Sequence, residues 1–196
     1  MSINDNSIHR LACAQRINIV GVSGSGKSTL GRFLGRSLNL PYFELDDVFW
    51  QPSWTESSDA EFLPKVETIV DQPCWVLDGN YSRTQQMKWS RAQVVIWIDL
   101  SLPVTLWRVT KRTLKRSLTQ ETLWSGNKET LSKALFSRSS IILWVLTSYR
   151  RVKRSYTAAL SADEYSDLCF IRLTSQAQIN ELQSALEEAT QGAKHD

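Results

Sequence analysis

A segment near the N-terminus has the residue types and the spacing of a phosphate-binding loop. Residues 21–28, GVSGSGKS, match the pattern G-x-x-x-x-G-K-[ST] between an apolar run and a helical pattern. Glycines let the backbone curl so that several N–H groups face one anion, while Lys27 and Ser28 would serve phosphates and Mg²⁺. A glycine-rich turn without a ligand would require neither side chain. The expected nucleotide-binding residues are Gly21, Ser23, Gly24, Ser25, Gly26, Lys27, Ser28 and Thr29.

Acidic and aromatic residues follow the second apolar run of the chain. Asp46 and Asp47 come directly after residues 42–45, and Trp50 and Trp54 lie a few residues further on. Open α/β sheets bind ligands at the carboxyl ends of their strands, so Asp46 is a candidate substrate-binding residue. The alternative for Asp46 and Asp47 is capping of the following turn. Trp50 and Trp54 are equally suited to stacking on a substrate ring and to packing inside the protein.

Apolar runs and helical periodicity alternate along the chain and predict an α/β fold. Short runs typical of buried strands occupy residues 16–20, 42–45, 74–77, 94–98 and 168–173. Helical spacing of apolar residues marks residues 29–38, 59–70, 103–117, 139–160 and 176–190. This alternation requires a parallel sheet with right-handed helical crossovers. The first fifteen residues have no apolar run and are interpreted as a loose polar leader.

Composition and charge indicate a folded, single-domain protein with a strongly basic segment. The chain has 196 residues, of which 42% are hydrophobic, so we expect one domain over residues 1–196 and exclude a disordered chain. Three cysteines without CxxC spacing, and no signal peptide, favour a cytoplasmic protein that does not bind a membrane. Residues 83–154 carry 15 Lys and Arg against 3 Asp and Glu. This segment faces a polyanion or a phosphorylated small molecule, unless it is only a solvated helical face.

Together these motifs resemble the adenylate-kinase-like P-loop kinases, and most closely the branch of DNA topology modulation (FlaR-type) proteins. The resemblance spans residues 16–175 and rests on the segments GVSGSGKSTL, LDDVFW, WVLDGNYSR, VIWIDL and WRVTKRTLKR. It implies a three-layer P-loop NTPase fold whose parallel five-stranded sheet has the strand order 2-3-1-4-5, with helices on both faces. It also implies a small helical lid within about residues 117–150.

The resemblance implies roles for individual residues as well. Asp78 would help to hold Mg²⁺ with Ser28, and Arg83, one position beyond the arginine of adenylate kinases, would hold the acceptor. Arg108 and Arg112 are one helical turn apart and would hold the triphosphate. The catalytic arginine is expected in the basic group of Arg150, Arg151, Lys153 and Arg154, with Arg150 as the first candidate.

At the end of the second strand the chain departs from adenylate kinases, which have Thr-Gly there. Asp46 is similar to the carboxylate with which shikimate- and gluconate-type kinases bind the acceptor hydroxyl. The hypothesis is a phosphotransferase that moves the γ-phosphoryl group of Mg·ATP to a small acceptor, either a nucleotide or a hydroxyl compound. Its catalytic residues would be Lys27, Asp46, Arg108, Arg112 and Arg150.

A regulatory P-loop ATPase associated with nucleic acid is the alternative function. Its contact with nucleic acid would be weak and non-specific, because the basic segment offers charge but no base-reading motif. A GTPase is disfavoured, since residues 127–130, NKET, lack the aspartate of the base-reading motif N-K-x-D.

Overall fold

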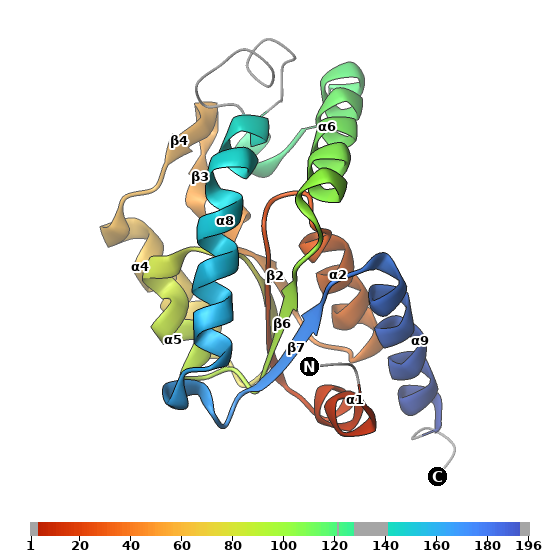
Figure 1. Ribbon diagram of the computed structural model, residues 1–196. Helices are drawn as coiled ribbons and strands as arrows, with labels where there is room; N and C mark the ends of the chain where they lie inside the picture. The colour runs from red at the N-terminus through yellow and green to blue at the C-terminus, as the bar shows by residue number, and fades with distance from the viewer. Residues whose placement is uncertain (1–3, 121, 128–140, 193–196) are drawn as a thin grey trace.

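The computed structural model describes residues 4–120, 122–127 and 141–192, and its centre is a five-stranded sheet (Figure 1). The strands are β1 (Arg16–Val20), β2 (Tyr42–Glu44), β5 (Trp75–Asp78), β6 (Val94–Ile98) and β7 (Cys169–Leu173). Their order in space is β2-β5-β1-β6-β7, and all neighbours are parallel. The predicted order 2-3-1-4-5 is confirmed, because β5, β6 and β7 are the third, fourth and fifth strands of this sheet.

Helices cover both faces of the sheet, as a three-layer fold requires (Figure 1). One face is covered by α1 (Asp5–Ala12), α2 (Lys27–Ser37) and α9 (Gln176–Gly192). The opposite face is covered by α3 (Leu45–Phe49), α4 (Asp59–Val70), α5 (Gln85–Trp89) and α8 (Ile141–Leu160). Strand β1 supplies both layers, because alternate side chains point to opposite faces: Ile17 and Ile19 pack in the first layer and Val20 in the second.

The carboxyl ends of the strands are covered by smaller elements that periodicity did not reveal. Strands β3 (Trp50–Gln51) and β4 (Thr55–Glu56) form an antiparallel hairpin beyond α3. A short 3-10 turn, η3 (Trp124–Gly126), lies against this hairpin: Ser125 Oγ donates to Trp50 O at 2.6 Å, and Asn127 Nδ2 donates to Gln51 O at 2.9 Å. The chain after α6 (Leu102–Thr119) therefore returns to the segment that follows β2.

The lid-like insertion expected at residues 117–150 lies partly outside the described residues. Residue 121 and residues 128–140 belong to this outside part. Within the described part, α6 continues to Thr119 and α8 begins at Ile141, so both ends of the expected insertion belong to long helices. Whether the segment between them moves as a lid stays a prediction.

The described part of the first fifteen residues, residues 4–15, does not form a loose leader, and for this part the expectation was wrong. Residues 5–12 form α1, whose first turn is capped because Asn4 Oδ1 accepts a hydrogen bond from Ser7 N at 2.8 Å. Leu11 is fully buried and Ala14 nearly so, against α9 and the sheet. The segment lacks an apolar run because a helix that buries one side needs apolar residues only every three or four positions.

Substitution of Leu11 tests whether α1 stabilises the domain. Leu11→Ala removes a fully buried side chain and leaves a cavity, so we expect the free energy of unfolding to fall by about 3 kcal/mol. Urea unfolding followed by circular dichroism measures this change. An unchanged unfolding midpoint would mean that α1 does not dock on the sheet in solution.

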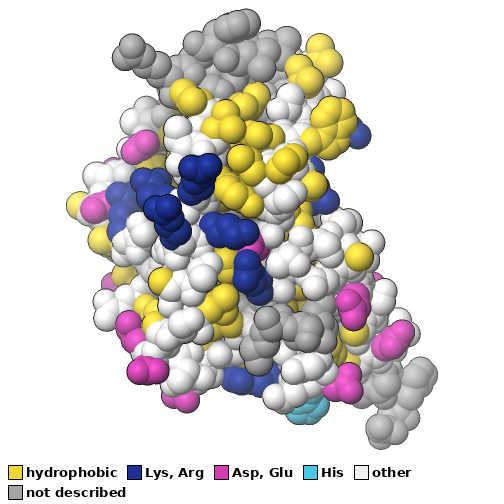
Figure 2. Space-filling view, in the orientation of Figure 1, with side chains coloured by type: hydrophobic (Ala, Val, Ile, Leu, Met, Phe, Trp, Pro, Cys, Tyr) yellow, Lys and Arg dark blue, Asp and Glu magenta, His cyan; other side chains and the backbone are white. Residues whose placement is uncertain are grey.

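Helices α6 and α8 pack against each other and leave large apolar side chains exposed, which gather on the face shown in Figure 2. These side chains are Val104, Trp107, Leu114, Leu118, Leu143, Trp144 and Leu146. Charged residues interrupt both helices, and no helix in the described ranges is long and apolar enough to cross a membrane.

Candidate phosphate and acceptor site

The predicted phosphate loop joins the end of β1 to the start of α2, at the carboxyl edge of the sheet. At Gly24 the backbone has φ +81°, and an added Cβ would lie 3.0 Å from Val109 Cβ and 3.1 Å from Thr105 O of α6. A larger residue at this position would therefore crowd α6 and strain the backbone. The last loop residue, Gly26, is the N-cap of α2, so the N-terminus of this helix faces the loop.

Two arginines of α6 reach the phosphate loop, and their expected role of holding a triphosphate stays a prediction. Arg108 Nη1 donates to Ser25 O at 3.2 Å, and Arg112 Nη2 donates to Ser23 Oγ at 3.0 Å. The spacing of four residues places both guanidinium groups on one side of the helix. The site thus gathers two fixed positive charges beside a glycine-rich loop at a helix N-terminus, an arrangement suited to a polyanionic ligand.

Lys27, Ser28 and Asp78 meet on the β5 side of the loop. Ser28 Oγ donates to Asp78 Oδ2 at 2.7 Å, and Lys27 Nζ lies 4.0 Å from Asp78 Oδ1. Burial raises the pKa of Asp78, and the charge of Lys27 opposes this rise. Thr29, also expected to bind nucleotide, is exposed in the first turn of α2.

The donor atoms at this point fit Mg²⁺. A serine hydroxyl and a carboxylate supply hard oxygen ligands, which this ion prefers, and Mg²⁺ is commonly held by one or two such groups together with substrate phosphates. Among the described residues, no group of three or more His, Cys, Asp or Glu side chains could hold a metal without such help. Ser25 Oγ is buried in the loop without a hydrogen-bond partner in the described structure.

Asp46 lies in the first turn of α3, directly after β2. Its Oδ1 accepts a hydrogen bond from the Tyr81 hydroxyl at 2.6 Å, and no side chain caps α3. Burial, followed by the charge of Asp46, raises the pKa of Tyr81, so this hydroxyl remains a proton donor. The charge of Asp46 also raises the pKa of Asp78, which places the two carboxylates within electrostatic reach of each other. The structure therefore gives Asp46 a tyrosine partner and does not make it the cap of α3.

Glu44 is part of this group of carboxylates, and sequence reasoning missed it. The Tyr42 hydroxyl lies 2.8 Å from Glu44 Oε1 and 3.1 Å from Asp78 Oδ2, so its one proton is shared between two carboxylates. Trp124 Nε1 donates to Glu44 Oε2 at 2.9 Å, which connects β2 to the turn η3. The sequence feature that could have indicated Glu44 is its position at the end of β2, at the same edge of the sheet as Asp78.

Arg83 is turned toward α4 in this structure. Its guanidinium group forms an ion pair with Asp59 and lies 5.1 Å from the ring centroids of both Phe49 and Phe62. Arg83 therefore lies against α3 and α4, and its guanidinium group is already paired with a carboxylate.

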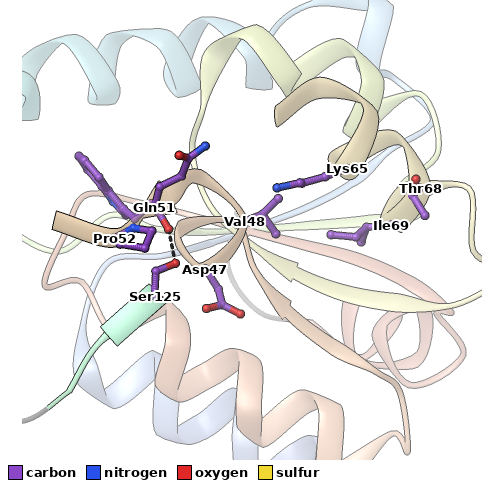
Figure 3. A pocket seen from close by; sticks show the side chains of 9 residues that line it. Asp47, Val48, Gln51, Pro52, Lys65, Thr68, Ile69 and Ser125 are labelled. Carbon is purple, nitrogen blue, oxygen red and sulfur yellow. Dashed lines mark hydrogen bonds between the residues drawn. The ribbon is translucent and has the colours of Figure 1, made fainter. Parts of the chain in front are cut away.

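Trp50 lies at an outer pocket rather than at the phosphate loop. The pocket has a volume of about 510 Å³ and is lined by residues of α3, α4 and the hairpin, as Figure 3 shows. Asp47 and Lys65 supply its charged groups. Trp50 also packs edge-on against Phe49 and Trp54, so its ring belongs to an aromatic cluster.

The basic group of α8 is not assembled at the phosphate loop by any contact of the described residues. Arg150 is exposed and has no hydrogen bond or ion pair with another described residue. Lys153 pairs with Asp99 at 3.3 Å, and Asp99 also binds Arg172. Lys153, one of the four basic residues of α8 that were candidates for the catalytic cation, is therefore paired with a carboxylate.

In sequence and in fold the chain is similar to P-loop kinases. No protein-family model matches the chain. The chain is 30% identical over 113 residues to shikimate kinase of Sulfurihydrogenibium sp., a match that covers 48% of this chain and 66% of that relative. It is 27% identical over 121 residues to shikimate kinase of Brucella suis, with 54% and 60% covered. The chain thus spans 60% to 66% of the length of these relatives.

Solved structures agree with this class at the level of the fold. Shikimate kinase from Acinetobacter baumannii in complex with shikimate matches with a TM-score of 0.51 at 16% identity, over 96% of this chain and 99% of that one. A gluconokinase from Sinorhizobium meliloti matches with a TM-score of 0.50 at 14% identity, over 92% and 96%. These neighbours show that the chain has the fold of small P-loop kinases. They do not support the closer similarity to FlaR-type proteins that the sequence motifs implied.

Proposed function

We propose that the protein transfers the γ-phosphoryl group of Mg·ATP to a hydroxyl group of a small molecule. The observation that carries this proposal is the convergence of Lys27, Ser28 and Asp78 on a phosphate loop that Arg108 and Arg112 also contact. Bound Mg²⁺ would be held by Ser28 and Asp78 and would supply neutralisation of phosphate charge. Lys27 and the two arginines would hold the triphosphate, and catalysis would rest on positioning and charge.

Asp46 supports a hydroxyl acceptor. Its carboxylate already binds one hydroxyl group, that of Tyr81, at 2.6 Å. In the proposed reaction Asp46 takes the proton of the acceptor hydroxyl while that oxygen attacks the γ-phosphorus, and ADP leaves with the electrons of the broken bond. The Tyr81 hydroxyl orients the carboxylate throughout.

The relatives indicate which acceptors to test first. Their names specify shikimate and gluconate, both of which are polyhydroxy compounds. Glu44 is paired with Arg32, Asp78 lies 4.0 Å from Lys27, and Arg83 is paired with Asp59, so each of these cations already has a carboxylate partner. Neutral polyols and sugars therefore belong in the same panel as the two acids.

Nucleic-acid regulation is not favoured by the comparisons, and the structure accounts for several cations of the basic segment. Arg108 and Arg112 bind the phosphate loop, Lys88 is fully buried, and Lys153 pairs with Asp99. The excess of positive charge in residues 83–154 is thus in part internal. Figure 2 shows Lys and Arg side chains of this face grouped beside an apolar surface.

A phosphate-transfer screen tests the proposed function. The protein is incubated with Mg·ATP and with shikimate, gluconate, neutral polyols, sugars, nucleosides or nucleoside monophosphates in turn. We expect ADP to form much faster with one hydroxyl compound than without any acceptor. ADP formation that no acceptor stimulates, or binding of no nucleotide at all, would contradict the proposal.

A further inference from the structure

Asn80 binds both backbone groups of Gly21, the first residue of the phosphate loop. Its Nδ2 donates to Gly21 O at 2.7 Å, and its Oδ1 accepts from Gly21 N at 2.9 Å. The contact joins the end of β5 to the end of β1 across 59 residues of sequence. Of the short side chains, only an amide offers a donor and an acceptor in the same plane at this distance.

Gly21 has no room to shift away from this contact. A Cβ on Gly21 would lie 2.6 Å from Ile98 O, at the end of β6 on the opposite side of β1. The backbone of Gly21 is therefore enclosed between Ile98 and Asn80. A change in the position of Asn80 would move the start of the loop.

A buried lysine supports the turn that carries Asn80. Lys88 of α5 is fully buried, and its Nζ donates to Gly79 O at 2.8 Å and to Asn80 O at 3.3 Å. Burial lowers the pKa of Lys88 to about 7. A buried amine is costly without partners, and here its partners are the two carbonyl groups of this turn.

A third contact reaches Asn80 from α8. The Tyr156 hydroxyl donates to Asn80 Oδ1 at 3.2 Å, and the Tyr156 side chain is buried beside Trp89 and Trp97. Burial raises the pKa of Tyr156, so its proton stays in place. Helix α8 also carries the basic group that begins at Arg150, so the same amide connects this helix to the phosphate loop.

We propose that Asn80 is a positioning residue: it fixes the start of the phosphate loop, and Lys88 and Tyr156 hold it in place for that purpose. This inference rests on the proposed function, since it requires that the loop bind ATP. Asn80 itself would touch neither ATP nor the acceptor. Its effect would appear as weaker binding of Mg·ATP, because a loop that starts in the wrong place aims its N–H groups poorly.

The chain contains a matched control for this contact. Gln93 also uses a side-chain amide to hold β1, but at the other end of the strand, where its Oε1 accepts from Gln15 N at 2.7 Å and from Arg16 N at 3.0 Å. Asn80→Ala and Gln93→Ala each remove two hydrogen bonds to the backbone around β1. Only the first of these variants changes the strand end that leads into the phosphate loop.

Titration of each variant with Mg·ATP, together with thermal unfolding, tests the inference. We expect the Kd for Mg·ATP to rise about tenfold or more in Asn80→Ala and to stay at the wild-type value in Gln93→Ala, while both lower Tm. An unchanged Kd in Asn80→Ala, or an equal rise in both variants, would overturn the proposal. Failure of the wild-type protein to bind Mg·ATP would instead contradict the proposed function.

A second variant decides the question if Asn80→Ala does not fold. Asn80→Asp keeps the shape and the bond from Gly21 N but places an acceptor against Gly21 O. We expect the Kd to rise again, and the rise to persist at high salt, where repulsion between the new charge and the phosphates is screened. A rise that disappears at high salt would contradict a positioning role.

Discussion

Lys27→Ala is expected to remove nearly all phosphoryl transfer while the domain stays folded. Lys27 lies at the phosphate loop, 4.0 Å from Asp78 Oδ1, and its proposed role is to hold the phosphates of ATP. Loss of one partner of such a charge contact typically costs ~2–5 kcal/mol, so the affinity for ATP should fall about 30- to several-thousand-fold. Nucleotide titration and a transfer assay measure the two effects.

Arg36→Ala is the control for this variant. Arg36 is an exposed cation in the last turn of α2, at the opposite end of the helix that begins with Lys27. It should retain wild-type affinity and turnover. Normal ATP turnover in Lys27→Ala would eliminate the proposed role of the phosphate loop.

Asp46→Asn should separate transfer from ATP binding. Asparagine keeps an oxygen for the Tyr81 hydroxyl, so the local structure should survive, but it cannot take up the proton of the acceptor. Loss of a general base typically lowers the rate by ~10²–10⁴-fold. We therefore expect transfer to collapse while the Kd for Mg·ATP changes little.

Asp47→Asn provides the comparison for Asp46. Asp47 is the next residue of α3 but lines the outer pocket with Lys65, so its variant should transfer phosphate normally. Partial recovery of Asp46→Asn at raised Mg²⁺ would mean that Asp46 holds the ion through water instead of taking a proton. Full transfer by Asp46→Asn at ordinary Mg²⁺ would exclude Asp46 from the acceptor site.

The part of the site that lies within one local pattern was predictable from the sequence. The glycines of residues 21–28, together with Lys27 and Ser28, predict a phosphate-binding loop. The spacing of Arg108 and Arg112 predicts that both lie on one face of a helix, and both contact this loop. The parallel sheet followed from the alternation of buried apolar runs with amphipathic helices, whereas its strand order came from the family resemblance.

Residues that act through long-range contacts were not predictable in this way. Asn80 lies within the segment WVLDGNYSR, but its partner Gly21 is 59 residues away in the sequence. Nothing in the local sequence indicates that the two residues are in contact. Glu44 meets Trp124 across 80 residues. Helix α1 was missed for another reason: its stability comes from docking of Leu11 on the core, which the short polar sequence does not reveal.

The most direct test of the account uses ATP labelled at the γ-phosphoryl group, with ATP labelled at the α-phosphoryl group as the control. The reaction is run with the acceptor that the screen identifies, and phosphorylated product and ADP are quantified together. If the protein transfers the γ-phosphoryl group, we expect label to move to the acceptor only from the γ position, with one ADP formed for each phosphorylated molecule. Label that appears only as inorganic phosphate, at a rate independent of the acceptor, would contradict it.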